Sequence, residues 1–323
     1  MEAYLGIDLG SVSTNFLVLS QDETALAHLY LRTQGNPIAA VQRGLIELQN
    51  QLSPEVTIRG VGSTGSGRHL AGVMVGADTV KNEITAHGIA AANELPDVQT
   101  VLEIGGQDSK IIILRNSMVV DFAMNTVCAA GTGSFLDRQA ERLGLSIEQF
   151  GQLAIRSKNP VRIAGRCAVF AESDMIHKQQ LGHSMEDIAR GLCQALVRNY
   201  LNNVAKGKEI LPPVLFQGGV AANAGMKQAF EEALKLKVTV PKQHAVMGAL
   251  GAALLARKKV HPGTKSSFRG FEISHWNFDV KGKHCGGCSN CCEVVEIIAE
   301  GQTLACWGDR CGRWSEQIGT QIA

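Results

Sequence analysis

The sequence predicts an α/β fold made of two related halves, because one hairpin pattern occurs twice in it. In each copy an apolar strand ends near an acidic residue, a turn rich in glycine follows, and a second strand returns. The first copy runs from Tyr4 to Ser20 and the second from Thr100 to Arg115. A further strand, Val214–Gln217, runs into Gly218 and Gly219, and we expect a helix over Ala224–Leu234. Repeated strand and turn units joined by helical segments are typical of a duplicated α/β domain.

The first turn has the composition of a phosphate-binding loop. Backbone N–H groups and hydroxyls in such a turn can cradle phosphate. The residues expected to do so are Gly10, Ser11, Ser13 and Thr14. Asp8, at the end of the strand, is placed to hold Mg²⁺ through water. No Gly-Lys-Ser/Thr follows the turn, so it is not a P-loop.

The second turn and two later glycine segments complete the predicted nucleotide site. Glycines allow the backbone to approach a phosphate, a ribose or a flat base closely. Small residues from Gly248 to Leu254 would let a helix pack closely, as a hinge between domains needs. The further cofactor-binding residues expected are Gly105, Gly106, Gln107, Gly131, Gly133, Gly218, Gly219, Val220, Asn223 and Gly248.

Composition excludes several classes of protein. The net charge is +1, so there is no general electrostatic basis for binding nucleic acid or an acidic membrane. The first residues do not resemble a signal peptide, and no apolar stretch is long enough to span a bilayer. Nine cysteines without a secretion signal indicate a reducing compartment, which we take to be the cytoplasm. Metal or redox roles for the cysteines are therefore favoured over disulfides.

Cys128 and Cys167 are the most informative cysteines. Each lies directly before the expected first turn of a helix. The unpaired N–H groups and the macrodipole at a helix N-terminus stabilise a thiolate or a negatively charged iron–sulfur cluster. Two thiols are half of the four ligands that such a cluster usually needs, and a second identical chain would supply the same two again. The alternative is a pair of buried structural cysteines.

The order of these segments resembles the acetate kinase, sugar kinase, Hsp70 and actin ATPases, which share a duplicated ribonuclease H-like fold. Within that fold, Cys128-Ala-Ala-Gly-Thr-Gly and Cys167-Ala-Val-Phe-Ala-Glu-Ser resemble the BadF/BadG/BcrA/BcrD-type ATPases. That family includes the activators of 2-hydroxyacyl-CoA dehydratases and the ATPase subunits of benzoyl-CoA reductase. The resemblance covers Tyr4 to Arg257 and includes Gly65–Arg68 and Asn82–His87.

The resemblance implies a homodimer with one [4Fe–4S] cluster bridged by Cys128 and Cys167 of both subunits. It implies that ATP or ADP binds with Mg²⁺ at the two hairpins, with Asp8, Glu103 and Asp108 as the catalytic residues. ATP hydrolysis would drive one electron to a partner dehydratase or a related CoA-ester reductase. A ferredoxin- or flavodoxin-like protein would supply that electron. Glu103 departs from the family, which usually has Asp at this position.

Four segments are expected along the chain. Residues 1–96 form the first ATPase subdomain, and residues 97–243 form the second subdomain with the helices that follow the cysteines. Residues 244–258 form a helix that returns to the first subdomain, and residues 259–323 form a linker and a cysteine-rich extension.

Six of the nine cysteines lie in the extension, at Cys285, Cys288, Cys291, Cys292, Cys306 and Cys311. A folded unit this small needs a metal or covalent staple. The spacing is compatible with a zinc ribbon and with a second [4Fe–4S] cluster, while disulfides are disfavoured in a reducing compartment. A similar segment in longer, fused relatives of the activators favours the second cluster slightly.

Two other functions remain open from the sequence. The chain could be a metabolite kinase of the same fold, with Asp108 as the catalytic base. It could also be a chaperone-like ATPase that reactivates a partner enzyme without moving electrons. A kinase would leave Cys128 and Cys167 unexplained.

Overall fold

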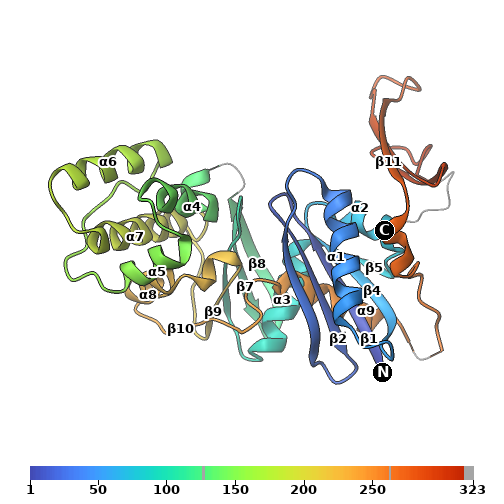
Figure 1. Ribbon diagram of the computed structural model, residues 1–323, viewed down its shortest axis with the longest axis horizontal. Helices are drawn as coiled ribbons and strands as arrows, with labels where there is room; N and C mark the ends of the chain where they lie inside the picture. The colour runs from blue at the N-terminus through green and yellow to red at the C-terminus, as the bar shows by residue number, and fades with distance from the viewer. Residues whose placement is uncertain (126–127, 262, 316–323) are drawn as a thin grey trace. The chain divides into compact units, whose positions relative to one another are not determined.

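The computed structural model describes residues 1–125, 128–261 and 263–315. The chain divides into two compact units. The first unit comprises Met1–Ala86 with Gly248–Ala323, and the second comprises His87–Met247. Each unit contains one five-stranded sheet (Figure 1), and a separate three-stranded sheet lies near the C-terminus.

The first sheet has the strand order β3-β2-β1-β4-β5. β1 pairs antiparallel with β2 and parallel with β4, while β2 pairs antiparallel with β3 and β4 pairs parallel with β5. The bounds are β1 (Glu2–Leu9), β2 (Ser13–Ser20), β3 (Ala25–Arg32), β4 (Thr57–Thr64) and β5 (Thr79–Val80).

The second sheet repeats this topology with the order β10-β9-β6-β7-β8. β6 pairs antiparallel with β7 and parallel with β9. At the outer positions β7 pairs antiparallel with β8, and β9 pairs parallel with β10. The bounds are β6 (Thr100–Ile104), β7 (Ser109–Arg115), β8 (Met118–Asn125), β9 (Val214–Gln217) and β10 (Val238–Thr239). Strand by strand, β6 to β10 correspond to β1 to β5. The duplicated α/β fold expected from the repeated hairpin is therefore confirmed.

One face of the first sheet carries α1 (Pro37–Gln51) and α2 (Arg68–Val75), as Figure 1 shows. Alternate β1 side chains, from Leu5 to Leu9, are buried in one cluster with both helices. α1 begins where Asn36 accepts a hydrogen bond from the Ala39 N–H and Pro37 occupies the first turn. Its buried positions 41, 45 and 48 recur at helical spacing, which fixes the face that meets the sheet.

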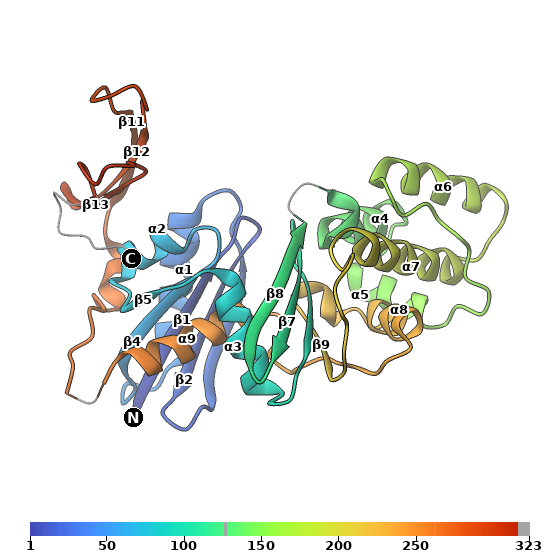
Figure 2. The same cartoon turned by 180° about the vertical axis from the view of Figure 1, so that it is seen from behind.

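The opposite face is built from glycine and alanine. α9 (Met247–Lys259) lies across this face (Figure 2). A Cβ atom on Gly6 of β1 would lie 1.8 Å from the Ala249 carbonyl oxygen, and one on Gly62 of β4 would lie 2.1 Å from that of Ala252. Only glycine permits this approach, so the glycines of the strands and the alanines of α9 together set the helix-to-sheet distance.

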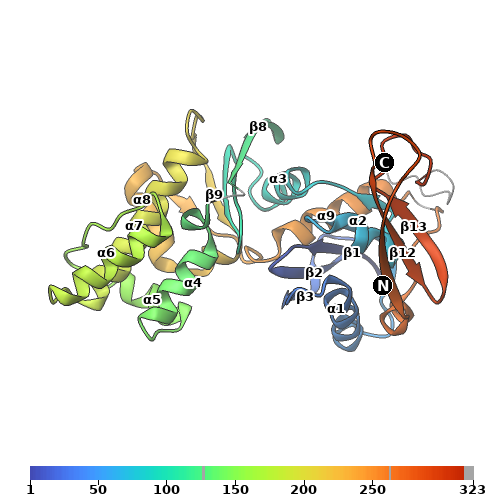
Figure 3. The ribbon, with the colours of Figure 1, turned by 90° about the horizontal axis from the view of Figure 1, so that it is seen from above.

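Among the described residues, four helices lie between β8 and β9 in the second unit, and a fifth lies between β9 and β10. They gather on one side of the second sheet (Figure 3) and share one core with it. Within that core, Phe230 packs edge-on against Tyr200 and Phe216, with ring centroids 5.3 Å and 5.0 Å apart. The helices are α4 (Gly133–Arg142), α5 (Ile147–Ala154), α6 (Ala168–Gln180), α7 (Met185–Asn203) and α8 (Ala224–Leu234). The expected helix over Ala224–Leu234 is thus confirmed.

The chain passes from the first unit to the second within α3 (Glu83–Glu94) and returns within α9. The described residues also contain three short 3-10 helices: η1 (Ala129–Gly131), η2 (Gly219–Ala222) and η3 (Phe271–His275). In the described part of the chain, no helix is both long enough and apolar enough to cross a membrane.

The C-terminal extension belongs to the first unit. η3 places Ile273 in the core beside α1, and Gln42 of α1 donates a hydrogen bond of 2.8 Å to the Trp276 carbonyl oxygen. The antiparallel strands β11 (Phe278–His284), β12 (Glu293–Ala299) and β13 (Gln302–Trp307) follow. Ile297 and Ala305 of this small sheet are buried against Val73 of α2.

Candidate functional site

The turn of the first unit is closed by a backbone hydrogen bond and is supported by the side chain of Thr33. The Gly10 N–H donates to the Ser13 carbonyl oxygen at 2.9 Å. Thr33 donates through its hydroxyl to the Gly10 carbonyl oxygen at 2.8 Å, and its Oγ1 lies 2.9 Å from Oγ1 of Thr14. Thr14 is therefore buried beneath the turn, while Ser11 and Ser13 stay accessible on it.

The carboxylate of Asp8, at the end of β1, is closely surrounded by other residues. A Cβ atom on Gly248 would lie 2.1 Å from Asp8 Oδ2, and one on Gly65 would lie 2.6 Å from Oδ1. Both glycines therefore make room for this carboxylate. Gly248 was expected as a nucleotide contact, and the structure places it against the catalytic candidate Asp8. Gly65, at φ +93°, belongs to the same group of residues.

Two buried oxygens beside Asp8 have no hydrogen-bond partner. Asn15 and Thr64 face Asp8 across the β2 and β4 ladders, and their Oδ1 and Oγ1 atoms are both buried and unsatisfied. Buried polar atoms without partners are costly, so a missing ion, water or ligand is the usual explanation. Oxygen donors in this arrangement fit Mg²⁺ and its waters.

The turn of the second unit repeats the same backbone hydrogen bond. The Gly105 N–H donates to the Asp108 carbonyl oxygen at 3.0 Å, as Gly10 does to Ser13. Glu103, at the end of β6, is buried with 4% of its surface exposed. The duplication therefore extends from the sheets to the turns.

Lys110 binds both candidate catalytic carboxylates of this turn. Its Nζ lies 3.1 Å from Glu103 Oε2 and 2.8 Å from Asp108 Oδ2, and its side chain is 3% exposed. This lysine was not predicted from the sequence. Lys110 is two positions after Asp108 on β7 and directly opposite Glu103 on β6, so the cross-strand pairing was the signal that could have found it.

His87 and Gln217 form a second buried polar pair in this unit. Gln217 Nε2 lies 2.7 Å from His87 Nδ1. Burial lowers the pKa of His87 to about 3, the Lys110 charge acts in the same direction, and Asp108 opposes both. The imidazole is therefore neutral at physiological pH and accepts a hydrogen bond from the Gln217 amide. His87 was not predicted as a site residue either, since 130 positions separate the pair.

Gly218 brings the end of β9 against β6. Its φ is +90°, and a Cβ atom there would lie 2.3 Å from the Ile104 carbonyl oxygen and 2.8 Å from Glu103 Oε1. Gly219 and Val220 follow in η2. Asn223 caps α8 by accepting from the Met226 N–H at 3.1 Å. The expected nucleotide residues of this segment thus lie at a strand end, a 3-10 turn and a helix start.

The start of α4 is fastened to the second turn. The N–H groups of Gly133 and Ser134 donate to the carbonyl oxygens of Gly105 and Gly106 at 2.8 Å and 2.9 Å. The Ser134 hydroxyl also donates to the Gly106 carbonyl oxygen at 2.6 Å. Gly131 is buried, and a Cβ atom there would lie 2.8 Å from the Asn125 and Asn199 side chains. The turn and the first residues of α4 therefore form one connected piece.

Cys128 and Cys167 lie close together on the second unit. Cys128 is the N-cap of η1 and Cys167 is the N-cap of α6, and neither side chain makes a capping hydrogen bond. Cys128 Sγ lies 3.9 Å from the carbonyl oxygen of Arg166, the residue before Cys167. Both cysteines are half-buried. Asn125 holds the Cys128 backbone by accepting from its N–H at 3.0 Å and donating to its carbonyl oxygen at 2.9 Å.

The other cysteines differ in their surroundings. Cys193 is fully buried in α7, where burial raises the pKa of its thiol to about 12, so it is a core residue. In the extension, Cys285, Cys292 and Cys306 lie around Val294 and Trp314, whereas Cys288, Cys291 and Cys311 are exposed. Within residues 1–125, 128–261 and 263–315, no three His, Cys, Asp or Glu side chains gather to hold a metal ion.

Two topologically equivalent sheets, each with an acidic glycine turn after its first strand, define an ATPase of the duplicated ribonuclease H-like fold. More specifically, the chain belongs to the BadF/BadG/BcrA/BcrD ATPase family, whose model matches residues 5–256. The C-terminal extension lies beyond this match.

Curated relatives cover most of the chain. It is 34% identical over 257 residues to the (R)-2-hydroxyglutaryl-CoA dehydratase activating ATPase of Acidaminococcus fermentans, covering 79% of this chain and 97% of that protein. It is 31% identical over 254 residues to the 2-hydroxyisocaproyl-CoA dehydratase activator of Clostridioides difficile, covering 78% of this chain and 94% of that one. One subunit of the benzoyl-CoA reductase of Thauera aromatica is 30% identical over 182 residues, covering 53% of this chain and 63% of its own length.

Solved structures show the same relationship. The C. difficile activator with bound ADPNP superposes with a TM-score of 0.73 at 31% identity, over 80% of this chain and 95% of that one. Component A of the A. fermentans dehydratase superposes with a TM-score of 0.72 at 32% identity, over 80% and 99%. A glucokinase of the ROK family from Streptomyces griseus gives 0.52 at 12% identity, over 79% and 99%, a likeness of fold alone.

Proposed function

We propose that this protein is an ATP-dependent activator of a 2-hydroxyacyl-CoA dehydratase or a related CoA-ester reductase. Hydrolysis of ATP drives the transfer of one electron to that partner through an iron–sulfur centre held by Cys128 and Cys167. One observation carries the proposal: two half-buried thiols converge at the starts of η1 and α6 in a chain of this ATPase family.

The nucleotide residues of the first unit are Asp8 and the turn from Gly10 to Ser13, while Thr14 lies buried beneath the turn and supports it. The unsatisfied oxygens of Asn15 and Thr64 support a hydrated Mg²⁺ at Asp8. In the second unit, Gly105, Gly106 and Gln107 supply the corresponding turn. Its phosphate contacts stay a prediction.

Lys110 adjusts the charge of the second turn. Glu103 and Asp108 would together repel a polyphosphate, and Lys110 offsets one of their two negative charges. Asp108 is the more accessible of the two carboxylates, with 31% of its side chain exposed against 5% for Glu103. We therefore assign Asp108 to positioning the attacking water and Glu103 to holding Lys110.

The donor set at Cys128 and Cys167 fits an iron–sulfur cluster. Both thiols are half-buried and neither is used as a helix cap. Cys167 lies at the start of α6, where helical N–H groups favour negative charge. When bound, such a cluster supplies one-electron transfer at low potential. Since two thiols are half of the usual ligand set, a second copy of the chain would contribute the other two.

Exposed apolar side chains on β8 and at the start of α6 support a homodimer. Met118, Val120 and Phe122 of β8, the strand that precedes Cys128, are each at least half exposed. Val169 and Phe170, directly after Cys167, are 68% and 67% exposed. Exposed apolar patches of this kind mark contact surfaces between proteins.

The contacts of α4 provide a route from the nucleotide to the cysteines. Three hydrogen bonds fasten Gly133 and Ser134 to the second turn, and Cys128 is five residues before Gly133. A change at the turn on hydrolysis would therefore shift the start of α4 and, with it, Cys128. Hydrolysis can drive a conformational change only if the ATP-bound and ADP-bound states favour different conformations. In this proposal the start of α4 is the element whose position differs between the two states.

The electron donor is a ferredoxin- or flavodoxin-like protein in this proposal, and the cytoplasm is the compartment. Nine cysteines in a chain of this length are typical of a reducing compartment, where metal and redox roles are favoured over disulfides. A second [4Fe–4S] cluster or Zn²⁺ in the extension stays a prediction, since it needs Cys288, Cys291 or Cys311 to move toward Cys285 and Cys306.

Iron and sulfide analysis after anaerobic purification tests the function. Wild-type protein should be brown and contain about four iron and four sulfide per dimer from the Cys128–Cys167 site. Cys128→Ala and Cys167→Ala should each lose that iron, whereas Cys193→Ala, which removes a buried thiol outside the site, should keep it. To exclude iron bound in the extension, each variant is also made with Cys288, Cys291 and Cys311 replaced by Ser. A colourless wild-type ATPase would instead favour a kinase or a reactivating ATPase.

A further inference from the structure

We propose that a cavity where α2, β5 and the C-terminal extension meet binds a small phosphate monoester. The cavity lies within the first unit. Among the described residues, none of either glycine turn lines it, and neither does any cysteine. The site is therefore separate from the nucleotide and iron–sulfur sites and goes beyond the proposed function.

The cavity has a volume of about 430 Å³. The outer face of α2 and the segment from Gly76 to Lys81 form part of its wall. The rest comes from Lys259 at the end of α9, from Ser267 and Arg269 of the linker, and from Leu304 of β13. Small-molecule sites measure roughly 300–1,000 Å³, so this cavity suits a metabolite smaller than a nucleotide.

The cavity carries an excess of positive charge. Lys81, Lys259 and Arg269 line it, and Asp78 is the one acidic residue among the described residues that do. None of the three cations forms an ion pair within residues 1–125, 128–261 and 263–315. Three cations against one carboxylate leave two positive charges in excess. A phosphate monoester carries about −1.5 to −2 at neutral pH, so one such group balances this excess.

Asp78 already has partners within the protein. Its carboxylate accepts hydrogen bonds from the Val61 N–H at 2.8 Å, the Ser266 hydroxyl at 2.7 Å and the Ser267 N–H at 2.8 Å. These bonds fasten the linker to β4 and offset part of the negative charge of Asp78. The three cations are therefore left to interact with a ligand.

The linker that carries Arg269 is also fixed against α2. The Arg269 N–H donates to the Val75 carbonyl oxygen at 3.0 Å. Gly76 has a φ of +69°, and a Cβ atom there would lie 2.2 Å from the Ser267 carbonyl oxygen, so only glycine permits this approach. The wall is thus preformed, which lowers the cost of ordering it around a ligand. From this wall the guanidinium of Arg269 can bind two phosphate oxygens at once.

The remaining wall suits the organic part of a phosphate ester. Val73, Val80 and Leu304 supply apolar contact. His69 lines the cavity too, and its Nδ1 is buried with no hydrogen-bond partner in the described part of the chain. Burial, with the charge of Arg68 acting in the same direction, lowers the pKa of His69, so the imidazole is neutral at physiological pH. The ring therefore offers a hydrogen-bonding nitrogen to a hydroxyl of the ester.

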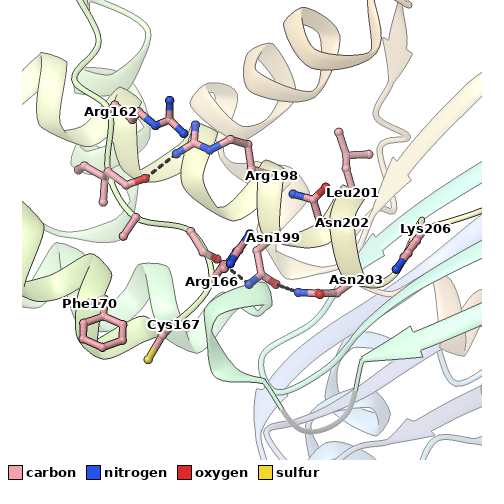
Figure 4. A pocket seen from close by; sticks show the side chains of 13 residues that line it. Arg162, Arg166, Cys167, Phe170, Arg198, Asn199, Leu201, Asn202, Asn203 and Lys206 are labelled. Atoms are coloured by element: carbon pink, nitrogen blue, oxygen red, sulfur yellow. Dashed lines mark hydrogen bonds between the residues drawn. The ribbon is translucent and has the colours of Figure 1, made fainter.

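A larger hollow of about 890 Å³ lies beside Cys167 in the second unit (Figure 4). Arg162, Arg166 and Arg198 line it, but so do Cys167 and Phe170. These last two residues belong to the proposed cluster and to the proposed contact surface between two copies of the chain. This hollow is therefore part of that site, and the cavity of the first unit is the separate one.

Isothermal titration calorimetry on the full-length protein tests the site. The protein is first loaded with Mg²⁺ and one equivalent of a non-hydrolysable ATP analogue per chain, which fills the glycine turns. Glycerol 3-phosphate, inorganic phosphate and malate are then titrated separately. The variants are Lys81→Gln combined with Lys259→Gln, and Arg269→Gln. Lys258→Gln, which removes an exposed cation next to Lys259 that does not line the cavity, is the matched control.

We expect one glycerol 3-phosphate per chain, bound more tightly than inorganic phosphate or malate. The double lysine variant and Arg269→Gln should each weaken this binding about tenfold, while Lys258→Gln leaves it unchanged. The three substituted cations are exposed, so both variants should fold. No binding by wild type, binding that survives in both variants, or inorganic phosphate or malate bound as tightly as the ester would overturn the proposal. Cys167→Ala should retain the binding, so this test stands apart from that of the iron–sulfur centre.

Discussion

Lys110 is the residue on which the second turn depends. Its ammonium group is buried and contacts two carboxylates. Removing Lys110 therefore deprives the buried Glu103 of the cation that lies 3.1 Å from its carboxylate. Breaking a buried ion pair by removing one partner costs about 3–5 kcal/mol. We therefore predict that Lys110→Met lowers the free energy of unfolding by about this amount in urea denaturation.

Lys110→Arg is the control for that change, because it keeps the charge and should recover part of the stability. A loss of less than about 1 kcal/mol in Lys110→Met would mean that Glu103 is protonated or solvated in the folded protein, and would contradict the assigned pairing.

His87 makes stability depend on pH. Its folded pKa is about 3, below the ordinary value, so between these two pKa values the unfolded chain binds a proton that the folded chain does not. The stabilisation is fully present above about pH 6.5 and is lost as the pH falls toward 3. Between about pH 7.5 and 5 the loss from this group is about 2 kcal/mol.

The measurement is the unfolding free energy of wild type and His87→Gln across this range. Other groups titrate in both proteins, so the difference between the two curves isolates His87. That difference should change by about 2 kcal/mol, and two parallel curves would show that His87 titrates normally.

At the residue scale, the sequence was enough to identify residues that belong to local patterns. Asp8 and the glycines after it indicate a turn, and Cys167 indicates the start of α6. Cys128 was expected to start a helix as well, but only the three-residue η1 follows it directly and α4 begins at Gly133. Lys110 could be identified only from the register of β6 on β7, and His87 only from its contact with Gln217 in the folded second unit. Pairings set by tertiary structure leave no periodic signal in the sequence.

At the scale of elements, α4 is the link between the second turn and Cys128. We predict that Ser134→Ala, which removes the hydroxyl bond to the Gly106 carbonyl oxygen, weakens this link but changes ATP affinity by less than about threefold. The readout is the rate at which iodoacetamide modifies Cys128 in metal-free protein, with and without an ATP analogue. Wild type should show a nucleotide-dependent rate, and Ser134→Ala should show a smaller dependence.

Ser146→Ala is the matched control, because it removes the cap of α5 and does not touch the turn. An equal loss of nucleotide dependence in both variants would assign the effect to general loosening of the second unit. A Ser134→Ala variant that behaves as wild type would remove α4 from the proposed route.

The three-stranded extension is a separate element that packs on α2. We predict that a chain ending at Asp279 keeps its rate of ATP hydrolysis within about twofold, since the apolar contacts of the lost strands are with Leu70 and Val73 of α2. Its thermal midpoint should fall, because Val73 becomes exposed. Loss of hydrolysis in a chain whose circular dichroism is unchanged would give the extension a functional role.

At the scale of the whole molecule, the hairpin repeat predicted the duplicated topology, and the structure extends the repeat to five strands per unit and one shared backbone hydrogen bond per turn. The cysteine pattern indicated a small folded unit in the extension, and the structure shows β12 and β13 paired there in one antiparallel sheet with β11. Its metal could not be decided from spacing, because zinc and iron–sulfur sites accept the same thiolate arrangement.

The central claim is that two copies of the chain share one cluster through Cys128 and Cys167. Native mass spectrometry of the anaerobically purified protein, with Cys288, Cys291 and Cys311 replaced by Ser, tests it most directly. We predict the mass of two chains plus one four-iron, four-sulfide cluster, and monomers without iron once Cys128 is replaced by Ala. A monomer that carries its own metal, or a dimer that carries two clusters, would contradict it.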